Sequence, residues 1–256
     1  MNPTRSIGAT AAVLMAAFAI AACGGKGEAG TDDSPGVSAG LPQGSEPVEL
    51  DPAEFTTEID NPYWPMRVGT RWVYRESDTE GTEQEVVVTV TGQTKTIANG
   101  VEARVVRDVV SENGEPVEVT DDWYAQDAAG NIWYLGEETT EYEDGKPVSK
   151  TGSFEAGVDG AQGGIVMPAN PEPGLTYRQE YYAGEAEDQG EIVALGEQAE
   201  TPAGHYEDVL MTRDTNPIEP KVLEFKFYAP GVGPVLATTV SGGSDREELV
   251  SFRPGG

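Results

Sequence analysis

Acid–base chemistry in this sequence would have to rest on carboxylates, because other catalytic side chains are scarce. The 256 residues contain 45 Asp and Glu and one histidine. That histidine, His205, lies in an expected tight turn, where an exposed residue is a simpler interpretation than a Ser-His-Asp triad. A carboxylate-based hydrolase would need two carboxyl groups about 5 to 9.5 Å apart. The alternative is a solvated acidic rim. The candidate carboxylates are Asp122, Glu155, Asp159, Glu180, Glu185, Glu187 and Asp188.

Calcium is the candidate cofactor, because hard cations take oxygen ligands from loops. Asp127 and Asn131 bracket a short turn that offers a carboxylate, backbone carbonyls and a side-chain amide. The simpler interpretation is a hairpin turn without a metal. A zinc or copper site is not expected from one histidine and one cysteine.

Four aromatic residues lie on the two expected strands that this turn joins. Adjacent residues of a strand point to opposite faces of the sheet. One of each pair is therefore expected in the core, and the other toward solvent, a concave surface or the long loop that follows. Aromatic rings with interspersed polar groups suit a saccharide or an apolar ligand, and packing on both faces is the alternative. The candidate ligand-facing residues are Trp123, Tyr124, Trp133, Tyr134, Glu155 and Asp159.

Cys23 is the only cysteine, and it follows an uncharged apolar stretch from Ile7 to Ala22. That stretch is marginal for a spanning helix, which needs roughly 20 residues, and has the length of a signal-peptide core. The run Ile20-Ala21-Ala22-Cys23 resembles the lipobox of bacterial lipoproteins. It predicts a signal peptide over residues 1–22 and lipidation of Cys23 with acyl chains such as palmitate. The chain would then be anchored to the outer side of a bacterial membrane. The alternative is an uncleaved anchor.

Composition restricts the partners and the domain organisation. The formal net charge of −29 argues against nucleic acid and anionic lipid surfaces, because the mean field repels them. Solubility of an exported protein is the simplest reason for the acidity. Residues 23–54 are rich in Gly, Ser, Pro and acidic residues, which predicts a disordered tether. Residues 55–256 are expected to form one β-domain, with a subdivision near residues 155–174.

Period-two patterns predict strands in that domain. Val86, Val88 and Val90 alternate with Val87, Thr89 and Thr91, and Leu223, Phe225 and Phe227 alternate with Glu224, Lys226 and Tyr228. In each case we expect the apolar series to face the core. Asn-Gly and Asp-Gly pairs, such as those at 113–114 and 144–145, favour hairpin turns. The sequence predicts an all-β antiparallel meander of about 10 to 13 strands. The glycine- and proline-rich segment 155–174 would be a long irregular connection, partly tucked onto the sheet, between two possibly related half-sheets.

Several motifs resemble an uncharacterised family of bacterial envelope lipoproteins. They include WYAQD at 123–127, EAGVDGAQ at 155–162 and YAPGVG at 228–233. The resemblance implies a strongly curved, half-barrel-like antiparallel sheet, and no established activity. We expect a non-catalytic binding or interaction module of the cell envelope that holds an apolar, saccharide or protein ligand. The alternatives are a carboxylate-based extracellular hydrolase and a purely structural acidic envelope protein.

Overall fold

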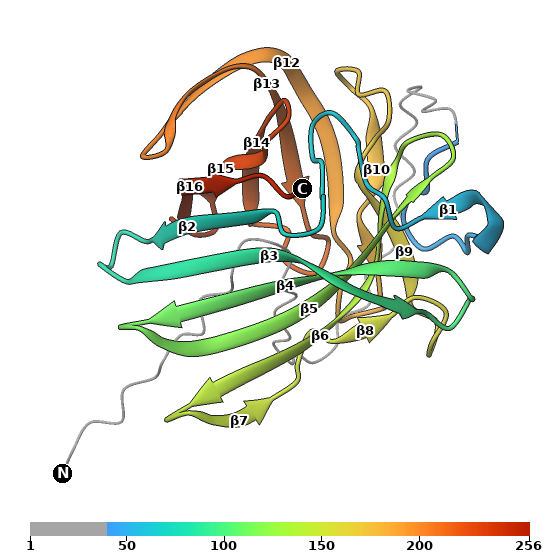
Figure 1. Cartoon of the computed structure of the whole chain (residues 1–256), viewed down its shortest axis with the longest axis horizontal. Coiled ribbons are helices and arrows are strands. Elements are labelled where there is room, and N and C mark those ends of the chain that lie inside the picture. Colours follow the sequence, from blue (N-terminus) through green and yellow to red (C-terminus); the bar gives the residue numbers. More distant parts are fainter. Residues whose placement is uncertain (1–39) are drawn as a thin grey trace.

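The computed structural model describes residues 40–256, which form one 16-stranded sheet after a short 3-10 turn, η1 (Pro52–Glu54) (Figure 1). All strand pairs are antiparallel. The strands are β1 (Phe55–Thr56), β2 (Arg71–Ser77), β3 (Glu83–Thr96), β4 (Glu102–Glu112), β5 (Glu115–Asp127), β6 (Ile132–Glu143), β7 (Lys146–Ser149), β8 (Phe154–Glu155), β9 (Gln162–Met167), β10 (Thr176–Arg178), β11 (Glu180–Tyr181), β12 (Gln189–Thr201), β13 (Gly204–Thr215), β14 (Leu223–Ala229), β15 (Gly233–Ser241) and β16 (Arg246–Arg253).

Most neighbours in the sheet are also neighbours in sequence, which confirms the predicted antiparallel meander. The turns at Asn113-Gly114 and Asp144-Gly145 have positive φ at both residues, as type I′ hairpins require. β16 pairs with β2, so the last strand joins the first long one. The two groups of strands on either side of residues 155–174 therefore belong to one continuous sheet.

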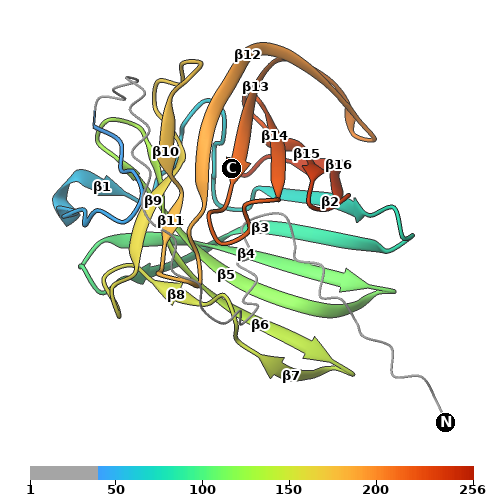
Figure 2. The same cartoon turned by 180° about the vertical axis from the view of Figure 1, so that it is seen from behind.

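A short extended segment brings the two ends of the sheet together. Within residues 176–181, β10 pairs with β12 while β11 pairs with β9 (Figure 2). The sheet is therefore nearly closed and barrel-like. Gly164 permits this closure, because a Cβ there would lie 2.4 Å from the carbonyl oxygens of Arg178 and Gln179. As expected, part of the 155–174 connection lies on the sheet, and it does so as the buried strand β9.

The chain already packs against the sheet at Pro42, within the predicted tether of residues 23–54. The carbonyl of Pro42 accepts a hydrogen bond from the Arg178 backbone amide at 2.7 Å. The Arg178 guanidinium donates to the carbonyls of Gly44 and Glu46. The tether prediction is therefore wrong for residues 41–54, because a buried arginine fixes this stretch. Residues 1–39, with the predicted signal peptide and Cys23, lie outside the described residues. No helix within 40–256 is long and apolar enough to cross a membrane.

Aromatic side chains fill one part of the interior. The Trp64 ring lies 5.7 Å from the rings of both Tyr124 and Tyr228, measured between centroids, and Tyr124 lies 5.1 Å from Tyr134. The β12–β13 hairpin arches over the sheet, and the amide of Ala203 at its turn donates to the carbonyl of Leu249 on β16 (Figure 1). The aromatic rings of Trp64, Tyr124, Tyr134 and Tyr228 belong to the hydrophobic core of the domain.

Candidate functional site

The predicted ligand-facing aromatic residues are all buried. Tyr124 and Tyr134 lie in the interior, whereas Trp123 and Trp133 face the outer side of the sheet. Phe55 covers Trp133 at 5.9 Å between ring centroids. The Lys95 ammonium lies 3.8 Å from the centre of the Trp123 ring. These four residues are therefore packed on both faces of the sheet, and their role in contacting a ligand stays a prediction.

The predicted calcium ligands serve the hairpin turn between β5 and β6. The Asp127 carboxylate accepts hydrogen bonds from the amides of Ala129 and Asn131, the Asn131 side chain and the Trp133 indole, all at 2.7 to 3.0 Å. Both carboxylate oxygens are engaged by these donors. Within residues 40–256, no group of three or more His, Cys, Asp or Glu side chains is placed to hold a metal ion.

The candidate carboxylates of the hydrolase hypothesis separate into two groups. Glu155 pairs with Lys95 at 2.8 Å on the outside, while Asp159 and Glu185 are exposed. His205 is exposed too, 3.0 Å from Glu200. The remaining candidates, Asp122, Glu180, Glu187 and Asp188, lie at or beside a much larger acidic cluster in the interior.

This cluster, the carboxylate ring, lines the interior beside the aromatic core. Its members come from nine different strands or their ends, and they interact electrostatically across the interior, Glu247 with Asp108 and Glu180 with Glu137. Most are fully buried, while Glu118, Asp188 and Glu224 are half-buried. The ring consists of Glu76, Asp108, Glu118, Asp122, Glu137, Glu180, Asp188, Asp214, Glu224 and Glu247.

Several ring members oppose one another directly across neighbouring strands. The register places Glu76 opposite Glu247 and Asp122 opposite Glu137. It also places Asp214 opposite Glu224. Like charges in such positions destabilise a sheet, and burial increases the penalty. The fold itself gains nothing from these pairs.

Lys226 is the one buried cation of the described chain that forms an ion pair with the ring. Its ammonium lies 2.9 Å from Asp214 and 3.3 Å from Glu224. The other buried cations, Arg104 and Arg178, donate to segments outside the ring. Lys226 therefore compensates one negative charge of the Asp214/Glu224 pair and leaves the ring with a large excess of acid groups.

Some ring oxygens have no hydrogen-bond partner although they are buried. Both carboxylate oxygens of Glu76 are of this kind, as are Oδ1 of Asp108, Oε1 of Glu180 and Oε2 of Glu247. These four side chains are at most 4% exposed. A buried polar atom without a partner costs about 1 to 3 kcal/mol, and more when charged. Such atoms are uncommon in folded proteins and call for a physical explanation.

Burial and neighbouring carboxylates raise the pKa values of the ring. The pKa of Glu76 rises to about 8 through burial and the charges of Asp245, Glu224, Asp108 and Glu118. Burial also raises the pKa of Glu137 to about 8, although Tyr134 and Thr139 donate hydrogen bonds to it. The pKa of Glu224 rises only to about 7, because the charge of Lys226 opposes the effect of burial. The ring therefore binds protons near neutral pH.

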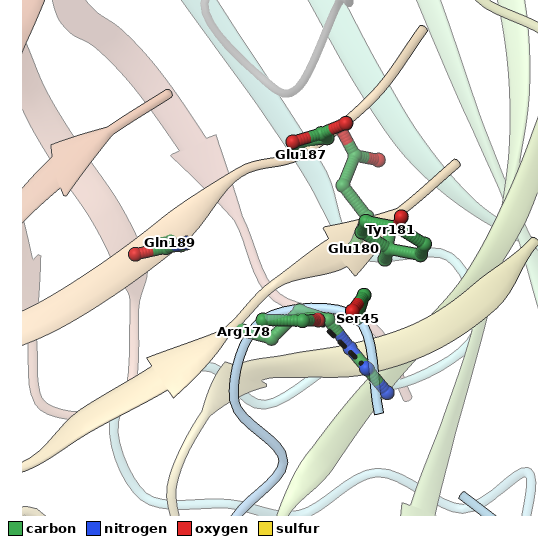
Figure 3. A pocket seen from close by; sticks show the side chains of 7 residues that line it. Ser45, Arg178, Glu180, Tyr181, Glu187 and Gln189 are labelled. Atoms are coloured by element: carbon green, nitrogen blue, oxygen red, sulfur yellow. Dashed lines mark hydrogen bonds between the residues drawn. The ribbon is translucent and has the colours of Figure 1, made fainter. Parts of the chain in front are cut away.

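A pocket of about 220 Å³ lies beside the ring at Glu180, under the N-terminal stretch that holds Gly44 and Ser45 (Figure 3). Glu187, Tyr181, Arg178 and Gln189 complete its lining. Glu180 belongs to both features, since its carboxylate also interacts with Asp188 and Glu137. The pocket thus adjoins the ring at Glu180.

Most ring members were not predicted from the sequence, and for Glu224 the reason is that β14 was assigned the wrong inner face. On β14, Lys226 and Tyr228 are buried, whereas Phe225 and Phe227 are only half-buried. The prediction for Val86, Val88 and Val90 on β3 is confirmed, since all three are buried. Acidic residues two positions from inward aromatics, as in Tyr74 and Glu76, are the sequence pattern that could have revealed the ring.

The fold and site define a barrel-like antiparallel β-domain with an acidic interior. No protein-family model matches the chain, and no curated protein matches it. Among solved structures, a predicted lipoprotein from Parabacteroides distasonis is similar at 14% identity and a TM-score of 0.41. The alignment covers 75% of this chain and 98% of that one. A likeness this distant carries no argument about function, so the resemblance to envelope lipoproteins stays a prediction.

Proposed function

We propose that this chain is an exported lipoprotein whose β-domain binds a cationic ligand on its carboxylate ring. The anchor is the lipid on Cys23, and the domain works on the outer side of a bacterial membrane. The observation that carries the binding proposal is the set of buried, unpartnered carboxylate oxygens on Glu76, Asp108, Glu180 and Glu247. A cation would supply the partner that these oxygens lack.

The ring is better suited to binding than to the two other expected functions. A hydrolase of the carboxylate type needs one ionised and one protonated carboxyl group at a substrate cleft. Here the acid groups surround the interior, and the candidates Glu155, Asp159 and Glu185 lie away from it. An apolar ligand would offer these carboxyl groups no hydrogen-bond donor, and a saccharide would offer no charge. A cation supplies both a donor and a positive charge, and it displaces the protons that the ring binds near neutral pH.

Thermal unfolding of the purified full-length chain at pH 8 tests the proposal with cations, neutral saccharides and fatty acids. A cation at about 100 times its dissociation constant stabilises the fold by about 2.7 kcal/mol. For a domain of this size, that raises the melting temperature by about 5 to 10 °C. Stabilisation by saccharides or fatty acids alone would contradict the proposal.

Two matched double variants distinguish cation binding at the ring from cation binding at the acidic surface. E76Q/E247Q removes two ring charges, and E83Q/E85Q removes two exposed charges from the neighbouring strand β3. The proposal expects the first variant to lose the stabilisation by cations and the second to keep it. An equal effect in both would assign the binding to surface charge and overturn the proposal.

A further inference from the structure

The arrangement of the ring distinguishes between a metal ion and an organic cation. A metal ion needs several oxygen ligands that converge on one point. The described part of the chain brings no group of three or more metal-ligating side chains together in this way. Instead, the ring presents carboxylate pairs at separate places along the interior, such as β2 with β16 and β5 with β6.

Lys226 shows how such a pair accepts a primary ammonium group. Its Nζ lies between Asp214 and Glu224, which oppose one another on β13 and β14, at 2.9 and 3.3 Å. The pairs Glu76/Glu247 and Asp122/Glu137 have the same cross-strand relation. Neither forms an ion pair with a cation of the described chain. The Tyr134 hydroxyl donates to Asp122 and Glu137, whereas Glu76 and Glu247 keep carboxylate oxygens without a partner.

Aromatic rings lie next to both of these pairs. Tyr74 precedes Glu76 by two residues on the inner face of β2, and Tyr124 follows Asp122 by two residues on β5. An aromatic face attracts an ammonium group and also packs against methylene groups. A carboxylate pair beside an aromatic ring therefore suits an alkylammonium better than a small hydrated ion.

We propose, on the basis of the proposed function, that the ligand is a linear polyamine whose ammonium groups bind the pairs Glu76/Glu247 and Asp122/Glu137. Each ammonium would bridge its pair as Lys226 bridges Asp214 and Glu224. The connecting methylene chain lies along the aromatic part of the interior. The pocket at Glu180 is the point of entry, because this residue lines both the pocket and the ring.

Calorimetric titration of the full-length chain at pH 8 and fixed ionic strength tests this ligand class. The probes are spermidine, n-butylamine and calcium chloride, each added to the parent chain, E76Q/E247Q and E83Q/E85Q. Because linked ammonium groups bind cooperatively, spermidine should bind about 100-fold more tightly than butylamine. Its affinity should fall by about tenfold or more in E76Q/E247Q and change by less than about twofold in E83Q/E85Q.

The outcomes separate this inference from the proposed function. Tighter binding of calcium than of spermidine, lost in E76Q/E247Q, would overturn the polyamine and leave the cationic site standing. Equal affinities for spermidine and butylamine would also overturn the polyamine alone. No binding of any of these cations at about 1 mM, near the weak limit of specific affinity, would overturn both.

Discussion

Replacing Glu76 with glutamine should stabilise the protein, and the gain should depend on pH. Glu76 lies opposite Glu247 on the neighbouring strand, is 3% exposed and has no partner for either carboxylate oxygen. Glutamine has nearly the same shape and no charge, so the packing is retained. Its amide can also donate a hydrogen bond to Glu247.

The size of the effect follows from the pKa of Glu76, which rises from 4.5 to about 8 in the folded protein. Between these values the folded chain keeps a proton that the unfolded chain releases. The protonated form therefore contributes full stability below about pH 4.5, and this contribution is lost as the pH rises toward 8. By pH 7 the loss is about 3 kcal/mol, of which about 2 kcal/mol arises between pH 5 and pH 7. E76Q does not show this loss, because glutamine does not ionise.

Urea denaturation at pH 5 and pH 7 measures the difference. The free energy of unfolding of E76Q relative to the parent should increase by about 2 kcal/mol between the two pH values. Glu85, exposed on β3, provides the control, and E85Q should show no such increase. If E76Q gains nothing between pH 5 and pH 7, or is the less stable chain at pH 7, burial and the neighbouring carboxylates do not raise the pKa of Glu76 as expected.

Three other substitutions test the remaining parts of the structure. K226M leaves Asp214 and Glu224 buried without their cation, so it should destabilise the fold by about 3 to 5 kcal/mol at pH 8, and by less at pH 5, as urea denaturation would show. G164A places a Cβ against two carbonyl oxygens of the closing segment; hydrogen exchange within residues 176–181 should accelerate, whereas unchanged protection would contradict the closure. R178M removes the guanidinium donors to the carbonyls at residues 44, 46 and 163; limited proteolysis should then cut within residues 41–50, and resistance of this stretch would show that other contacts hold it.

The sequence predicts those parts of the fold that depend on local patterns. On β3 the series Val86, Val88 and Val90 is entirely apolar, whereas the alternate series contains two threonines, so the inner face can be predicted and is confirmed. The turn at Asn113-Gly114 is also recognisable, because few other residues adopt positive φ at both positions. The antiparallel order follows from such turns, since they join neighbouring strands.

Other features could not be predicted because they depend on distant parts of the chain. Closure of the sheet requires the segment 176–181 to meet β9 and β12, and no local pattern indicates this double pairing. The packing of residues 41–50 depends on the side chain of Arg178, more than a hundred residues away. On β14, the rule that apolar residues face inward fails, because the interior at that level is acidic.

The acidity of this protein therefore has two different physical origins. Exposed carboxylates such as Glu83 and Glu85 remain hydrated, so they favour solubility at little cost in stability. Buried ones such as Glu76 and Glu247 add nothing to the surface and destabilise the sheet by opposing each other. A purely structural acidic envelope protein would need only the first kind. Apolar residues at the ring positions would pack without the desolvation penalty, which supports the proposal that these carboxyl groups serve to bind a ligand.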